Sequence, residues 1–194
     1  MTKEIETVNT STGEVAAITD MDHWHLMRQQ AETLVKSGFL PVAINTPEKA
    51  LAIMQKAKEL GIPPMEGLSS ISIIQGKPSV SPQLMLGLAR RTKELEDIEM
   101  KSDEKGATVT IKRKGQTAYT THFGVKEATD MGLIGKDNWK KQFSVMAQWR
   151  ALAANLRITF PDAIAGIYTS DELTDGEMTV TTRGPVQMPK AIEG

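Results

Sequence analysis

The sequence of 194 residues contains no cysteine. Composition therefore excludes disulfide bonds, thiolate zinc sites, iron–sulfur clusters and thiol catalysis. Aromatic residues are also few, at 5%, and no apolar run reaches the roughly eighteen residues that a transmembrane helix needs. The polar, acidic beginning MTKEIETVNTSTGEV has no signal-peptide core, so we expect a cytosolic or nuclear protein with no membrane partner.

Motifs for nucleotide binding and hydrolysis are also missing. At 135–137, Gly-Lys is followed by Asp instead of the Ser or Thr of a phosphate-binding loop, and GxGxxG, HExxH and GxSxG do not occur. His23 and His25 would point roughly 200° apart on a helix, which makes a poor metal site. His122 has no serine or cysteine motif to pair with. The acidic ELEDIE at 94–99 is interpreted as a solvated helix end, not as a metal-binding nuclease cluster.

What is present is an ordinary globular composition, with 40% hydrophobic and 24% charged residues. The net charge of −1 is unevenly distributed: residues 1–20 hold one basic and four acidic residues, and residues 171–194 hold two and five. The middle, 21–170, holds 20 basic and 15 acidic residues, which suggests an anionic partner. We expect a flexible acidic N-terminal segment at 1–20, one core domain at 21–170 and a flexible acidic tail at 171–194.

Local patterns predict helices at both ends of this core and strands in its middle. Amphipathic periodicity with capping residues and N-terminal prolines predicts helices over 21–36, 46–60 and 81–95. The β-branched run at 68–74 predicts a strand, and alternation predicts an antiparallel meander over 98–102, 107–115 and 116–124. Further along, we expect a short helix at 125–132, a loop at 133–138, a long helix at 138–157 and a turn or helix at 161–168. This order predicts an α+β fold, with a small antiparallel sheet packed against several helices.

The segment NWKKQFSVMAQWRALAANLR, 138–157, combines an apolar pattern with many cations. A helical projection places Trp149 in a buried stripe. The other members of this stripe are Val145, Met146, Leu152, Ala153 and Leu156. Arg150 and Arg157 fall on its border, about 10 Å apart, with Trp139 beside them. Guanidinium groups at such a border suit phosphate oxygens, and the alternative is that both arginines pair with carboxylates elsewhere in the fold.

Two other basic elements are candidates for an anionic ligand. Lys136, Lys140 and Lys141 lie at the predicted helix start, where the helix dipole disfavours cations, so a ligand is a plausible explanation for them. The turn with KRKG at 112–115 is the second, and an exposed charged turn is its alternative interpretation.

Residues 138–173 closely resemble the C-terminal half of the DNA-binding domain in the RecT/Redβ (Bet) family of phage single-strand annealing proteins. The shared pattern consists here of Trp139, Met146, Arg150, Arg157, Phe160, the AGIY of 165–168 and the acidic pair Asp171-Glu172. Upstream, residues 58–91 are similar to the family's stretch from a helix-ending "LG.P" through a strand and turn to a helix closing with "LARR". Together the resemblance covers roughly residues 40–175.

The resemblance implies a protein without covalent catalysis that binds single-stranded DNA, anneals complementary strands without ATP and holds the annealed duplex, in phage-type homologous recombination. It implies a homo-oligomer, as a ring or helical filament, with a basic groove between the helices and the small sheet. No cofactor is required, and Mg²⁺ serves only as a DNA counterion. The implied setting is the cytoplasm of a bacterial host, with the protein encoded by a phage or prophage. Further implied partners are a phage exonuclease and the host single-strand-binding protein.

Position by position, the resemblance also implies DNA contacts. Arg150 and Arg157 match positions that the family uses on DNA, whereas Ser144 stands where the family has a further basic residue, for which Lys140 or Lys141 can substitute. The LARR ending supplies two more arginines, with roles in DNA binding, folding or subunit contact. The predicted DNA-binding residues are Arg150, Arg157, Lys140, Lys141, Trp139, Arg90, Arg91, Lys112, Arg113 and Lys114.

Two rival functions and one departure from the family remain open at this point. A metal-dependent nuclease would cleave the same DNA, and a passive oligomeric coat would bind single strands without annealing them. Family members often carry a separate C-terminal module for partner proteins, but only about twenty mostly polar residues follow Leu173. We therefore expect that module to be missing, in a natural short form or in a truncated chain.

Overall fold

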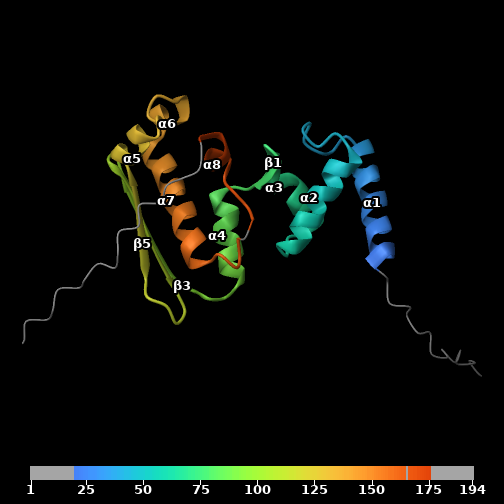
Figure 1. The fold of residues 1–194 in the computed structure, drawn as a ribbon, viewed down its shortest axis with the longest axis horizontal. Helices are drawn as coiled ribbons and strands as arrows, with labels where there is room; N and C mark the ends of the chain where they lie inside the picture. Colours follow the sequence, from blue (N-terminus) through green and yellow to red (C-terminus); the bar gives the residue numbers. More distant parts are fainter. Residues whose placement is uncertain (1–19, 165, 176–194) are drawn as a thin grey trace, which may run out of the picture. The chain divides into compact units, whose positions relative to one another are not determined.

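The computed structural model describes residues 20–164 and 166–175 (Figure 1). The predictions for 1–19 and 176–194 lie outside the described residues. The chain divides into two compact units, with the boundary between Ala52 and Ile53. None of the helices in the described ranges is both long enough and apolar enough to cross a membrane.

The first unit holds helix α1 (Asp20–Lys36) and the beginning of helix α2 (Pro47–Glu59). Both helices were predicted from their end signals, and the structure agrees closely. Gly38 ends the first with a left-handed φ of 70°, and the main-chain N–H of Lys49 donates to the Thr46 hydroxyl at 3.3 Å, as expected of a capping threonine.

The second unit is an α+β fold, as predicted. Within the described residues, its elements after α2 are helices and two groups of antiparallel strands, and four helices follow the last strand. They are α3 (Pro64–Ser70), β1 (Ser72–Ile74), β2 (Lys77–Ser79), α4 (Pro82–Arg91), β3 (Leu95–Asp103), β4 (Gly106–Arg113), β5 (Tyr119–Gly124), α5 (Val125–Asp130), α6 (Asp137–Lys141), α7 (Phe143–Thr159) and α8 (Ser170–Asp175). Helix α8 covers residues 170–175, at the start of the segment that the sequence predicted to be an acidic tail.

Strands β3, β4 and β5 form the predicted antiparallel meander, but its first strand begins earlier than expected. The interpretation of 94–99 as a helix end is wrong, since β3 begins at Leu95. Lys93 takes a left-handed φ of 60° just after α4 and so turns the chain out of the helix. Ile98 then lies opposite Ile111, and this pairing of apolar side chains sets the register of the two strands.

The predicted strand at 68–74 is only partly correct. Its first half belongs to α3, and only Ser72–Ile74 is extended. Gln75 and Gly76 both have positive φ, at 51° and 76°, and form the two-residue turn that connects β1 to β2.

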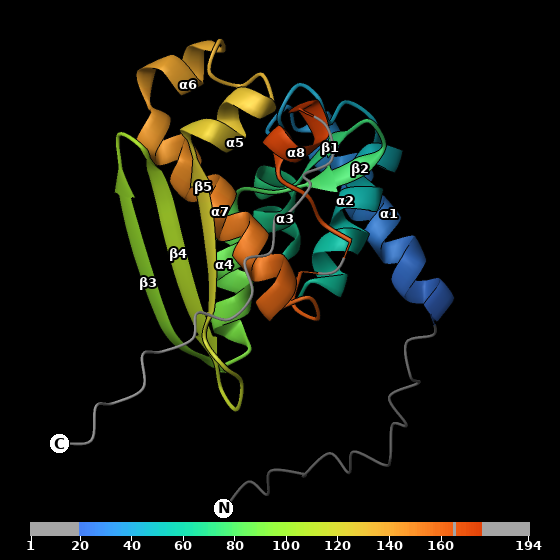
Figure 2. The ribbon, with the colours of Figure 1, turned by 60° about the vertical axis from the view of Figure 1, so that its left-hand side comes forward.

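Helix α7 packs against all three strands of the meander and also against α4 (Figure 2). The core between them contains Met85 and Leu88 from α4, Val109, Ile111 and Phe123 from the sheet, and Leu152 and Leu156 from α7. Because neighbours cover α7 on more than one side, every residue from Arg150 to Leu156 is buried.

The long helix predicted at 138–157 is in fact two helices. Gln142, with φ −143° and ψ 47°, leaves the helical region and separates α6 from α7. The break accompanies burial of Trp139, whose ring centre lies 5.6 Å from that of Phe123 and 5.9 Å from that of Phe143. Trp139 is only 3% exposed, so its predicted place on a DNA-facing edge is wrong.

Candidate nucleic-acid interface

Arg150 lies in the interior of the protein, not at the predicted border of a buried stripe. It is 1% exposed, and its Nη2 donates a hydrogen bond to the main-chain carbonyl of Asp171 at 3.1 Å. The helical projection assumed a single buried stripe, but α7 is covered by the sheet and by α4. The same assumption misplaced Trp149, which is half-buried, and Val145, which is exposed.

Arg157 lies two turns further along α7, and its side chain keeps 28% of its surface exposed. Its Nε and Nη2 donate to the two carboxylate oxygens of Glu172, at 2.8 and 2.5 Å. The alternative interpretation, pairing with a carboxylate of the fold, is thus confirmed for Arg157. Among the described residues, nothing accepts a hydrogen bond from the remaining group, Nη1.

Glu172 is built firmly into the start of α8. It is 6% exposed, it accepts a hydrogen bond from the main-chain N–H of Thr169 at 2.7 Å, and its own N–H faces the Thr169 hydroxyl at 3.4 Å. This reciprocal arrangement is a capping box. Burial alone would raise the pKa of Glu172, but the hydrogen bonds from Arg157 and Thr169 and the Arg157 charge together hold it below the ordinary value.

Two cations, Arg157 and Lys77, lie over the ring of Tyr168. The Arg157 guanidinium carbon lies 5.1 Å from the centre of the Tyr168 ring, and Nζ of the exposed Lys77 lies 4.9 Å from the same centre. The tyrosine is fixed beside β2, because its N–H donates to the Pro78 carbonyl and its carbonyl accepts from Val80. We call Lys77, Arg157 and Tyr168 the Tyr168 cluster.

A third cation approaches the same loop from α2. Lys56 Nζ lies 3.6 Å from the point where a Cβ on Gly166 would stand, two residues before Tyr168. The same ammonium group pairs with Glu59 at 3.1 Å. Cations from α2, β2 and α7 therefore meet around one short loop, although each element reaches it from a different part of the chain.

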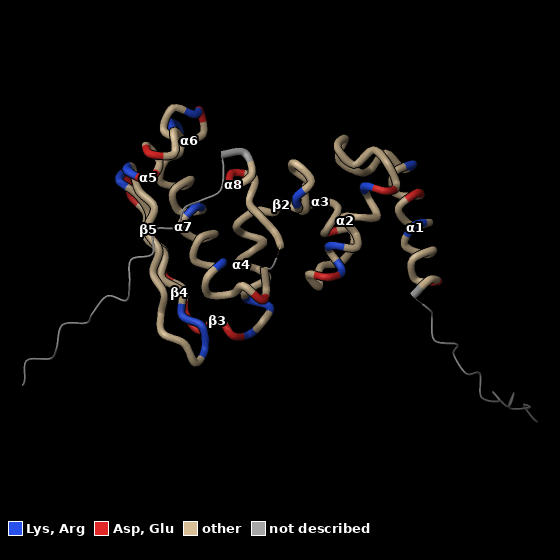
Figure 3. Tube along the Cα trace, viewed as in Figure 1, with Lys and Arg blue, Asp and Glu red and all other residues tan. Residues whose placement is uncertain are grey.

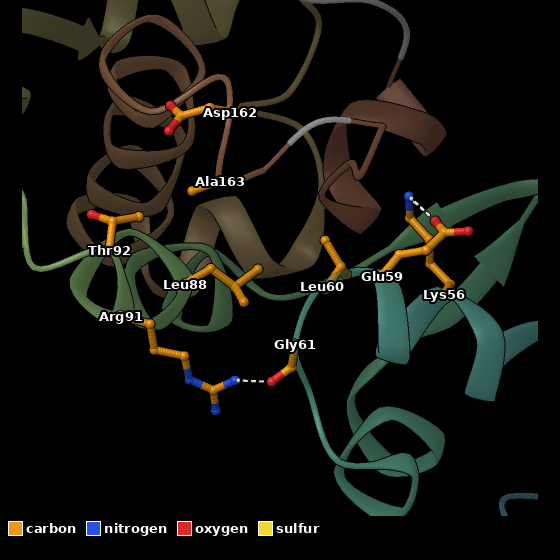
Figure 4. A pocket seen from close by; sticks show the side chains of 9 residues that line it. All are labelled: Lys56, Glu59, Leu60, Gly61, Leu88, Arg91, Thr92, Asp162 and Ala163. Carbon is orange, nitrogen blue, oxygen red and sulfur yellow. Dashed lines mark hydrogen bonds and ion pairs between the residues drawn. The ribbon is translucent and has the colours of Figure 1, made fainter. Parts of the chain in front are cut away.

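Lys56 also lines an open pocket of about 520 Å³ (Figure 4). The end of α2 and Gly61 form one side, and the end of α4 with the turn at 162–163 forms the other. Arg91 lies at its rim, where its guanidinium donates to the Gly61 carbonyl at 3.1 Å and to Glu66 at 3.3 Å. The lining combines both signs of charge with apolar side chains, which include Leu60 and Leu88.

In the predicted basic turn at 112–114, Arg113 and Lys112 form ion pairs within the protein. Arg113 donates to Glu94, to Asp162 and to the Thr159 carbonyl, and its guanidinium carbon lies 4.8 Å from the centre of the Phe160 ring. Every nitrogen of its guanidinium is thus engaged. The hydrogen bonds that it donates to Asp162, and then those to Glu94, raise the Arg113 pKa. Lys112 pairs with Glu96 at 2.6 Å, and Lys114 is exposed.

The other predicted contacts are spread over the second unit. Lys140 and Lys141 are exposed on α6, which precedes the start of α7 at Phe143. Arg157 lies near the other end of α7, about 20 Å along the helix from Phe143. Arg90 is exposed beside Arg91 at the end of α4. Basic and acidic segments are interleaved in each unit (Figure 3), so no element is basic throughout. Of the predicted residues, Arg157 belongs to the Tyr168 cluster and Arg91 lines the pocket that Lys56 also lines.

Sequence reasoning missed Lys56, Lys77, Tyr168 and Glu172 as members of the site. The TSDE of 169–172 has the spacing of a capping box, so Glu172 could have been assigned to a helix start from the sequence. The lysines carry no comparable signal, because their contacts with the 166–168 loop depend on the tertiary fold.

Comparison of this chain with protein-family models and with the curated proteins gives no match. Within the described residues, no group of three or more histidine, aspartate or glutamate side chains is placed to hold a metal ion.

Proposed function

We propose that this protein binds single-stranded DNA and anneals complementary strands without ATP, as an oligomer in phage-type recombination in the bacterial cytoplasm. The observation that carries the proposal is the Tyr168 cluster, together with Lys56 near the same loop and the pocket that Lys56 lines. Two cations, Lys77 and Arg157, lie over the ring of the half-buried Tyr168, and a third, Lys56, lies near Gly166 of the same loop. Such a combination of charge and aromatic surface suits a single-stranded polyanion.

The cluster also unites the two segments that resemble the RecT/Redβ family. Lys77 comes from residues 58–91, and Arg157 and Tyr168 come from residues 138–173. Both segments therefore contribute to a single candidate interface. The resemblance and the geometry support the same proposal. The sequence pattern already contains Arg157 and Tyr168, and the structure adds their contact and the approach of Lys77.

Phosphate contacts at this site predict a particular kind of binding. Neutralising phosphates releases counterions, so affinity falls as salt rises, and the strand's sequence matters little. Annealing then requires neighbouring subunits to hold one strand extended while a second strand tests its pairing. Base pairing supplies the specificity, and the protein supplies alignment and charge neutralisation.

The proposal is tested by mixing complementary oligonucleotides with the protein without ATP, with and without Mg²⁺. Annealing is followed by energy transfer between dyes on the two strands, and cleavage by electrophoresis. We expect faster annealing with no cleavage. A parent protein that fails to speed annealing contradicts the proposal: binding alone indicates a passive coat, and Mg²⁺-dependent cleavage indicates a nuclease.

The site itself is tested with the double variant Lys77→Ala/Arg157→Ala. We expect affinity for an oligonucleotide to fall by about tenfold or more, and the slope of log affinity against log salt to shrink by about 0.7 for each lost phosphate contact. The matched control is Lys126→Ala, which removes an exposed lysine of α5 that pairs with Asp130. Equal losses in the control and the double variant would place the interface elsewhere.

A further inference from the structure

The Arg157–Glu172 pair has a geometry that leaves part of the arginine available. Glu172 occupies the edge of the guanidinium formed by Nε and Nη2, and the plane lies near the Tyr168 ring. The opposite edge, with Nη1, has no acceptor among the described residues. An arginine held along one edge can still donate to an anion along the other, because its five N–H groups form a fixed planar fork.

A DNA phosphate is poorly placed to displace Glu172. The carboxylate is buried, it accepts from Arg157 and from the Thr169 N–H, and it forms half of the capping box of α8. Removing it from Arg157 would leave a buried carboxylate without its charge partner, which is costly. The surroundings therefore favour a carboxylate that stays in place when a ligand arrives.

We propose that Glu172 is a positioning residue for DNA: it holds the Arg157 guanidinium beside Tyr168 in one orientation, with the Nη1 edge directed at a backbone phosphate of the single strand. This inference rests on the proposed function and adds to it a residue that itself touches no DNA. A long arginine fixed before binding loses less freedom when the phosphate arrives. Lys77, on the same ring, supplies a second charge for the same stretch of backbone.

The test compares Glu172→Gln, Arg157→Ala and the double variant, with fluorescence anisotropy of a labelled thymidine oligonucleotide as the measure of affinity. The loss of one fixed side chain predicts affinity about two- to tenfold weaker for Glu172→Gln. In the double variant, Glu172→Gln adds no further loss to that of Arg157→Ala, because Glu172 acts only through Arg157.

Glu127→Gln is the matched control. Glu127 caps the short helix α5 as Glu172 caps α8, with its carboxylate accepting from the Gly124 N–H at 2.9 Å. A general effect of losing a helix cap weakens both variants equally, whereas a positioning effect is confined to Glu172. Thermal unfolding of each variant establishes that it is folded. If Glu172→Gln does not fold, Glu172→Asp keeps the charge, withdraws it by one methylene and is expected to weaken binding in the same direction.

Three results overturn the inference while leaving the proposed function intact: unchanged affinity in a folded Glu172→Gln protein, tighter binding that shows Glu172 competes with phosphate, or losses that add in the double variant. A parent protein that does not bind the oligonucleotide overturns the proposed function, and the inference with it.

Discussion

The guanidinium of Arg150 precedes that of Arg157 by two turns of α7, but the two groups meet different surroundings. Arg150 is enclosed and donates to a main-chain carbonyl at the start of α8, whereas Arg157 is partly exposed and meets a carboxylate and an aromatic ring. Both bind α8, so the arginines of one helix hold the next helix in place. Only the second is placed to meet a ligand as well.

Arg150→Ala is therefore expected to act on stability. The substitution leaves a cavity and orphans the Asp171 carbonyl, so the free energy of unfolding should fall by about 3–5 kcal/mol. Urea denaturation followed by circular dichroism measures this change. A variant of parental stability that binds DNA more weakly would instead place Arg150 at the interface.

At the scale of helices and strands, local signals in the sequence predicted the ends of elements correctly where a neighbouring capping residue determines the end. Ser81 accepts from the Leu84 N–H at 3.2 Å at the start of α4, in the position that the Ser-Pro pair predicted. Local signals did not predict the end of a helix where a contact with a residue distant in the sequence determines it. Gln142 is neither glycine nor proline, and no local rule marks it as a break. The break accompanies the packing of Trp139 against Phe123, a residue distant in the sequence.

In the candidate site, too, some residues could be predicted from the sequence and others could not. Arg157 could be singled out from its helix position, and its carboxylate partner was an open alternative. Lys77 could not be singled out, because a lysine after a turn glycine is ordinary, and only the pairing of β2 with the chain at Tyr168 gives it a neighbour. Arg150 was misplaced because a one-sided projection cannot show that a helix is covered on two sides.

The packing of α3 against the end of α2 leads to a prediction for Gly67. A Cβ at this glycine would lie 2.3 Å from the Cβ of Ala57, which is too close for any side chain. Gly67→Ala should therefore lower the free energy of unfolding by about 1–3 kcal/mol, measured by urea denaturation.

Gly87→Ala is the matched control, because a Cβ at this helical glycine meets nothing within 4 Å. Alanine is the better helix former, so this substitution should raise the free energy of unfolding by about 0.5–1 kcal/mol. If both substitutions change the free energy of unfolding equally, the close approach of Gly67 to Ala57 does not determine the effect of Gly67→Ala.

For the whole molecule, the two lowered carboxyl pKa values determine how stability responds to acid. The hydrogen bond from Arg113 holds the pKa of Asp162 below its ordinary value, and Glu172 is lowered despite its burial. Because both pKa values are lower in the folded protein, the unfolded chain binds more protons in acid. The stabilising contribution is present above the ordinary values of 3.8 and 4.5 and is lost as pH falls through the lowered ones.

We therefore expect the free energy of unfolding of the second unit to fall steadily below about pH 4.5, when measured by urea denaturation at a series of pH values. Glu172→Gln removes one of the two groups. The free energy of unfolding of this variant should therefore fall less steeply with decreasing pH than that of the parent. An equally steep fall in this variant would mean that other carboxyl groups control acid unfolding.

Because Trp139 is buried between two phenylalanines, its intrinsic fluorescence can report on the packing around it. Trp139 is 3% exposed, Trp149 is half-buried and Trp24, in the first unit, is 45% exposed. An indole in an apolar enclosure emits at shorter wavelength than one in water, and a dissolved quencher reaches it less readily. Iodide therefore quenches mainly the red side of the emission, from Trp24, while the blue side reports on the junction of α6 and α7. Loosening of that junction can be followed without attaching a dye.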